Sequence, residues 1–124
     1  MKILLLIGTG SFIGGVCRYL LSQWIQPKSL GTFPVGTLIV NLTGCLVIGI
    51  IFGIAEKGNI SNEMKLFFAT GLLGGFTTFS AFSNETFTLL NAGHYSQAIM
   101  YVLASVLIGL LATFLGFVII SKSL

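Results

Sequence analysis

Residues 74–82 read GGFTTFSAF and lie inside a stretch that is long and apolar enough to cross a membrane. Adjacent glycines weaken a helix, and threonine and serine hydroxyls offer the backbone other hydrogen-bond partners. A helix break here would free main-chain carbonyls, which at membrane depth must be buried in protein, face water or bind a cation. Freed carbonyls at broken membrane helices coordinate hard cations such as Na⁺. The motif therefore predicts a helix break that handles ions.

Phe79 and Phe82 follow the predicted break and are three residues apart, so a helix places both rings on one face. Packing is the ordinary role of phenylalanine in a membrane. The edge of an aromatic ring is electropositive, however, so two rings that present their edges would form a desolvated path for a small anion. Such a path binds an ion weakly enough to release it. Both interpretations stay open on the sequence alone.

Three other polar side chains lie within apolar stretches. Arg18 costs about 2.5–3.5 kcal/mol at the centre of a membrane, so it either extends to the interface near Tyr19 or places a positive charge at a vestibule. Asn41 either bonds another helix or donates to an anion. Glu85 is the one carboxylate inside a predicted span, and a proton-coupled transporter needs such a group.

Hydroxyl groups recur along the last apolar stretch, at Tyr101, Ser105 and Thr113. Their roughly helical spacing indicates a polar stripe on one face. Serine and threonine in membrane helices often bond their own i−4 carbonyls instead, and tyrosine often lies at the interface. Tyr101 is also placed to donate to a passing ion.

The composition determines which elements must position these groups. Of 124 residues, 55% are hydrophobic and 7% are charged, against about 25% charged in a soluble domain. The sequence predicts an all-α membrane protein with one domain, residues 1–124, and no separate soluble part. Its charges are scattered, so we expect no nucleic-acid partner. No nucleophile, base and orienting group come together, so we expect no enzymatic activity.

Hydropathy predicts four transmembrane helices, at about 3–25, 35–55, 64–90 and 98–120, with the third helix broken. Each has 20 residues or more, enough at about 1.5 Å per residue to cross a hydrocarbon core of about 30 Å. An even number of spans puts both termini on one side of the membrane. The lysines favour a cytoplasmic location for that side by a small margin, which also fits a protein inserted in both orientations. The four lysines on the side of the termini are Lys2, Lys57, Lys65 and Lys122.

Sixteen glycines in so hydrophobic a chain predict close helix packing. Because four spans have little interior of their own, packing against a second copy, a homodimer, is the natural expectation. Cys17 and Cys45 lie in separate spans, and we expect both to be buried structural thiols. The small-xxx-small pairs are Gly10 with Gly14, Gly49 with Gly53, and Gly71 with Gly75.

Three motifs together resemble the CrcB/Fluc family of fluoride channels. They are GGFTTFSAF in the third span, GTLIVNLTG around Asn41 in the second, and GGVCRY in the first. The resemblance covers the whole chain. It implies an antiparallel, dual-topology homodimer with two fluoride pores, in the inner (plasma) membrane of a bacterium, that releases cytoplasmic fluoride passively.

The resemblance also implies roles for individual residues. A structural Na⁺ would be held by the main-chain carbonyls of Gly74 and Thr77 from each subunit. Phe79 and Phe82 would line the pores, and Asn41 would donate to fluoride. Glu85 would lie near a pore end, and the polar tracks would contain Ser80, Tyr101, Ser105 and Thr113.

An alternative is a small multidrug-type, proton-coupled transporter, also with four spans. That class carries a glutamate in its first span, whereas the predicted first span here has Arg18 as its only charge.

Overall fold

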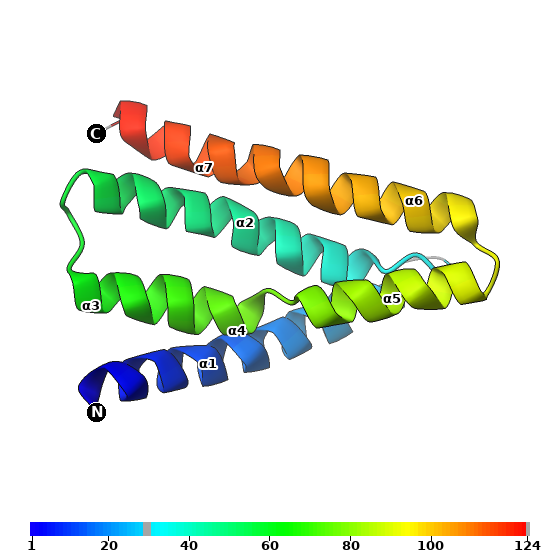
Figure 1. The fold of residues 1–124 in the computed structure, drawn as a ribbon, viewed down its shortest axis with the longest axis horizontal. Helices are drawn as coiled ribbons and strands as arrows, with labels where there is room; N and C mark the ends of the chain where they lie inside the picture. Colours follow the sequence, from blue (N-terminus) through cyan, green and yellow to red (C-terminus); the bar gives the residue numbers. More distant parts are fainter. Residues whose placement is uncertain (29–30, 124) are drawn as a thin grey trace.

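The computed structural model describes residues 1–28 and 31–123, and these form long helices that lie side by side (Figure 1). Four helical stretches in the described residues are long and apolar enough to cross a membrane: Lys2–Lys28, Val35–Glu56, Asn62–Asn91 and Tyr95–Ser123. This confirms the predicted all-α membrane architecture, and each helix reaches or slightly passes the ends expected from hydropathy. Both termini lie at the same end of the bundle (Figure 1).

The four stretches differ in regularity. The first is α1 (Lys2–Ile25) with a short 3₁₀ turn, η1 (Gln26–Lys28), and the second is α2 (Val35–Glu56). Wider π-helical turns, which the sequence did not predict, interrupt the third and fourth stretches. The third consists of α3 (Asn62–Lys65), the π segment η2 (Leu66–Leu73), α4 (Gly74–Phe76) and α5 (Phe79–Asn91). The fourth consists of α6 (Tyr95–Leu103), the π segment η3 (Ala104–Ile108) and α7 (Gly109–Ser123).

Glycines allow the helix backbones to touch. α1 packs against η2 and α4, and α2 packs mainly against α7. A Cβ at Gly14 would overlap the main-chain oxygen of Leu72, and a Cβ at Gly49 would overlap that of Thr113. Small residues at such crossings let dispersion contacts form along the backbone, where lipid supplies no hydrophobic driving force. The predicted close packing at the paired glycines is therefore confirmed.

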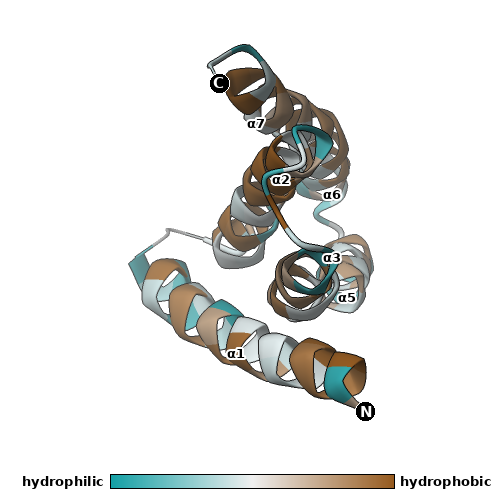
Figure 2. Cartoon of the chain, turned by 90° about the vertical axis from the view of Figure 1, so that its left-hand side faces the viewer, coloured by the Kyte–Doolittle hydropathy of each residue, from teal (hydrophilic) through white to brown (hydrophobic). Residues whose placement is uncertain are grey.

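The interior of a single copy is thin. One buried cluster contains Val40, Ile51, Leu73 and Phe76, and a second contains Leu89, Ala98 and Tyr101. Most other large apolar side chains lie on the outside, and Figure 2 shows hydrophobic residues over much of the helix surfaces, those of α7 above all. Such a surface suits lipid or a second copy. The expectation that Cys17 is buried was wrong, because its helix α1 turns that face outward.

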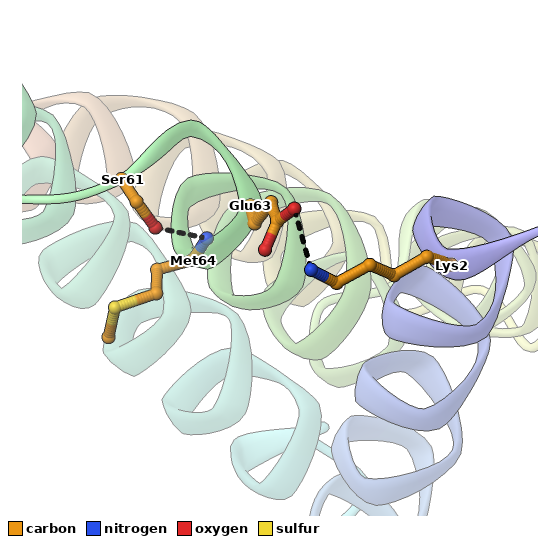
Figure 3. Close-up of polar contacts among 4 residues, drawn as sticks. All are labelled: Lys2, Ser61, Glu63 and Met64. Atoms are coloured by element: carbon orange, nitrogen blue, oxygen red, sulfur yellow. Dashed lines mark hydrogen bonds and ion pairs between the residues drawn. The ribbon is translucent and has the colours of Figure 1, made fainter.

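Polar contacts fix the end of the bundle that holds the termini (Figure 3). The Ser61 hydroxyl caps α3 by accepting from the N–H of Met64 at 3.2 Å. Lys2 and Glu63 form an ion pair of 2.9 Å between side chains that are largely exposed. Exposed pairs of this kind contribute only about 0.2–1 kcal/mol. The pair of Lys2 and Glu63 mainly fixes position, since it holds the start of α1 beside the start of the third span.

We predict that Gly14→Ala destabilises the fold by about 1–3 kcal/mol, because the added methyl group meets the rigid backbone of η2. Thermal unfolding in detergent measures the effect. Gly8→Ala is the matched control, since Gly8 lies on the same helix with open space around its Cβ position. Equal stability of the two variants would contradict the role of direct backbone contact.

Candidate functional site at the helix break

The third span is broken, as predicted, but the break follows the paired glycines instead of coinciding with them (Figure 1). Helical geometry continues through Gly74 and Gly75, and the chain becomes extended at Thr77 (φ −85°, ψ 153°) and Thr78 (φ −147°, ψ 121°). One of the two glycines has another role: a Cβ at Gly75 would overlap the main-chain oxygen of Ser11 in α1. Gly75 thus serves packing, and the conformational change occurs at the two threonines.

Asn41 on α2 satisfies the backbone of Thr78. Its Oδ1 accepts from the Thr78 N–H at 3.0 Å, and its Nδ2 donates to the Thr78 carbonyl at 3.1 Å. One side-chain amide therefore replaces the partners that a helix would supply. Of the two interpretations of Asn41, bonding between helices is what the structure shows, and its second N–H takes no part in these two bonds.

Main-chain carbonyls lose their helical donors at the break, and those of Gly74 and Thr77 are among them. In a continuous helix the Thr78 N–H would bond to the Gly74 carbonyl, and the Ala81 N–H would bond to the Thr77 carbonyl. Here the Thr78 N–H bonds to Asn41, and the Ala81 N–H bonds to the Thr78 hydroxyl at 3.2 Å. Gly74 and Thr77 are the residues that the resemblance assigned to a cation, and their oxygens suit that chemistry.

Arg18 reaches the same break from α1. Its Nε donates to the carbonyl of Gly75 at 3.2 Å, and the side chain is half-buried. A cation is favourable where a helix exposes its last carbonyls, because the helix dipole is negative there. Arg18 thus stabilises the end of α4 on the side facing α1, and its role at a vestibule stays a prediction.

A groove opens beside the break on the other side. It has a volume of about 390 Å³ and brings together residues of α2, the third span and η3. Phe79, with 79% of its surface exposed, lies 5.7 Å from Phe82 between ring centroids, at an interplanar angle of 46°. The sequence-predicted site residues that line this groove are Asn41, Gly74, Thr77, Phe79, Phe82 and Ser105.

A second polar cluster lies next to the groove. Glu85 accepts from the Thr37 hydroxyl at 2.7 Å through Oε1 and from the Tyr101 hydroxyl at 2.8 Å through Oε2. Tyr101 is fully buried and Thr37 is 7% exposed. The ring of Phe82 stacks on that of Tyr101 at 5.1 Å between centroids, which connects the cluster to the groove. Sequence reasoning gave Thr37 no role, although it precedes Asn41 by one turn on the same face of α2.

The remaining hydroxyls are in different environments. Ser80 lies 3.2 Å from the Thr78 hydroxyl, and Thr113 donates to the main-chain oxygen of Cys45 at 3.0 Å, which joins α7 to α2. The buried hydroxyl oxygen of Ser105 in η3 has no hydrogen-bond partner among the described residues. A buried polar atom without a partner requires an explanation in a native fold. A common polar track through these residues and Tyr101 stays a prediction.

Comparison with known proteins assigns the chain to a family. Residues 5–117 match the family described as CrcB-like protein, Camphor Resistance (CrcB). This chain belongs to the CrcB family. The chain is similar to the fluoride-specific ion channel FluC of Phocaeicola vulgatus, with 44% identity over 94% of this chain and 96% of the relative. It is also similar to the FluC of Flavobacterium psychrophilum, with 45% identity over 96% of this chain and 97% of the relative. The FluC of Thermus thermophilus is 42% identical over 91% of this chain and 89% of the relative.

We predict that Asn41→Ala exposes the Thr78 N–H to exchange and destabilises the fold by about 1–3 kcal/mol, because a main-chain donor loses its partner. Amide hydrogen exchange at Thr78, together with thermal unfolding, measures the change. Thr43→Ala is the control on the same helix, since the Thr43 hydroxyl bonds only the carbonyl of Ile39 within α2. Unchanged exchange at Thr78 in Asn41→Ala would refute the pairing.

Proposed function

We propose that this chain forms a fluoride-selective ion channel that releases cytoplasmic fluoride passively across the membrane. The observation that carries the proposal is the groove at the break, which brings Asn41 together with Phe79 and Phe82. Relatives that cover nearly the whole chain at more than 40% identity and are named fluoride-specific ion channels support the choice of ion. Fluoride enters cells as the weak acid HF and is trapped as the anion at neutral pH, so a passive path outward suffices.

The side chains of the groove suit a small anion that has lost much of its water. Thr78 binds both the Oδ1 and the Nδ2 atoms of Asn41, so the side-chain amide is held in place and the direction of its second N–H is fixed before an ion arrives. The edges of Phe79 and Phe82 offer positive partial charge without a full charge that would trap the ion. Binding that is favourable enough for entry and weak enough for exit is the requirement for conduction.

The functional unit that we propose is an antiparallel homodimer of dual topology, a multi-pass protein of a bacterial inner membrane. The groove lies open on the surface of one copy, and the thin interior leaves large apolar faces for a partner to cover. The slight lysine bias accords with insertion in both orientations. Two copies would provide two such grooves.

The same dimer would hold a structural Na⁺ through the main-chain oxygens of Gly74 and Thr77 from each copy. Support comes from the hydrogen bonding at the break, which removes the helical donors of both carbonyls, and from the position of both residues on the groove. Na⁺ would offset the partial negative charge that these oxygens carry at membrane depth. The Thr77 hydroxyl, which donates to the carbonyl of Leu73 at 2.9 Å, would hold the residue in place.

We predict that Phe79→Ile and Phe82→Ile each reduce fluoride efflux from liposomes about tenfold, because each removes an electropositive ring edge from the path, and a factor of ten corresponds to a loss of about 1.4 kcal/mol. Phe87→Ile is the control, since Phe87 lies on the same helix, is exposed and does not line the groove. Size-exclusion chromatography verifies assembly, and chloride is the comparison ion. Wild-type rates in both groove variants would mean that the rings only pack.

We predict that the wild-type protein unfolds at a higher temperature in NaCl than in KCl, and that Thr77→Ser retains this difference. The ligand is expected to be the main-chain oxygen, and serine can still donate to the Leu73 carbonyl. Thermal unfolding of the detergent-purified protein provides the measurement. Equal stability of the wild type in the two salts would contradict the proposed Na⁺ site. Loss of the difference in Thr77→Ser alone would contradict main-chain coordination.

A further inference from the structure

A second cleft, far along the chain from the break, lies at the end of the bundle that holds both termini. Its volume is about 310 Å³. Glu56 ends α2, and Lys65 lies one turn inside the start of the third span; Figure 1 shows α2 between α3 and the C-terminal part of α7 at this end of the bundle. Because helix ends mark where the spans leave the hydrocarbon, the cleft is level with the lipid headgroups. It is lined by Phe52, Ala55, Glu56, Lys65 and Phe117.

Opposite charges line this cleft without forming an ion pair with each other. The Nζ of Lys65 lies 5.1 Å from the centroid of the Phe52 ring, and the side chain is half-buried. Lys2 with Glu63 is the one ion pair found between the described residues, so Glu56 and Lys65 face the same space as separate charges. The fixed position of Lys65 over an aromatic face limits its freedom to extend into water.

We propose that this cleft binds the headgroup of phosphatidylethanolamine. The ammonium of Lys65 binds the lipid phosphate, and the carboxylate of Glu56 accepts from the lipid ammonium. Phe52 and Phe117 form the apolar walls beside the glycerol and the first acyl carbons. The cleft contains none of the residues assigned to fluoride or Na⁺, so the site is independent of the proposed conduction.

Glu56 and Lys65 distinguish lipids by the charges and the hydrogen-bond donors of their headgroups. An anionic phosphatidylglycerol offers a phosphate to Lys65 but only uncharged hydroxyl donors to Glu56, whose negative charge also repels the net charge of that lipid. Phosphatidylcholine has both charges, but its quaternary ammonium has no N–H to donate to a carboxylate. Phosphatidylethanolamine matches both ends, because its primary ammonium donates hydrogen bonds.

The experiment is native mass spectrometry of the full-length protein with equal amounts of palmitoyl-oleoyl phosphatidylethanolamine and phosphatidylglycerol. We expect the wild type to retain phosphatidylethanolamine roughly two- to fivefold better, as one partly exposed ionic contact allows. Glu56→Gln should remove the preference, and Lys65→Gln should weaken the binding of both lipids. Glu63→Gln is the matched control, a carboxylate at the same end that contacts Lys2 and lies outside the cleft.

A second measurement needs no variant. Stepwise N-methylation of the ethanolamine headgroup should lower retention by the wild type at each step, since each methyl group removes one donor. Equal retention of phosphatidylethanolamine and phosphatidylglycerol, or no effect of methylation, overturns the proposal. So does an unchanged preference in Glu56→Gln, or the loss of the preference in Glu63→Gln. Absence of any retained lipid, as when a second copy covers the cleft, overturns it as well.

Discussion

The pairing of Asn41 with the backbone of Thr78 is the interaction on which the site depends. At membrane depth no water is available to satisfy a main-chain donor or acceptor, so a broken helix must find its partners within the protein. The amide of Asn41 provides one acceptor and one donor to the same residue. Arg18 supplies a donor on the opposite side of the break, at Gly75. These contacts make an extended segment tolerable where a continuous helix would otherwise be favoured.

α2 positions both polar clusters, because Thr37 and Asn41 lie one turn apart on it. Asn41 fixes the break, Thr37 fixes Glu85, and the stacked rings of Phe82 and Tyr101 connect the two. The position of α2 is fixed in turn by backbone contact with α7, at Gly49 and through the hydroxyl of Thr113. The glycines and this threonine therefore act on the groove through the placement of a helix, at a distance from it.

The four spans and the presence of a helix break could be predicted from the sequence, whereas the hydrogen-bond partners of individual residues could not. Hydropathy gave the four spans because each must bury about 20 apolar residues in lipid, and GGFTTFSAF gave the existence of the break. The position of the break was missed because the sequence does not distinguish a glycine needed for close packing, such as Gly75 against Ser11, from a glycine needed for flexibility. The partner of Asn41 is main chain, which has no sequence signature. The π segments η2 and η3 have no characteristic residue type either.

The charged side chains nearest the break lie outside the groove, which bears on the proposed conduction. The nearest carboxylate, Glu85, accepts from the hydroxyls of Thr37 and Tyr101, and these two dipoles offset part of its negative charge. Arg18, the cation at the break, donates to Gly75 on the α1 side, and neither residue lines the groove. The groove wall combines amide, hydroxyl, carbonyl and aromatic groups with aliphatic side chains such as Ile48 and Leu73, and it carries no full charge. An anion there would meet partial charges that compensate for lost water without holding the ion, because a lysine or arginine on the wall would bind it too tightly for rapid exit.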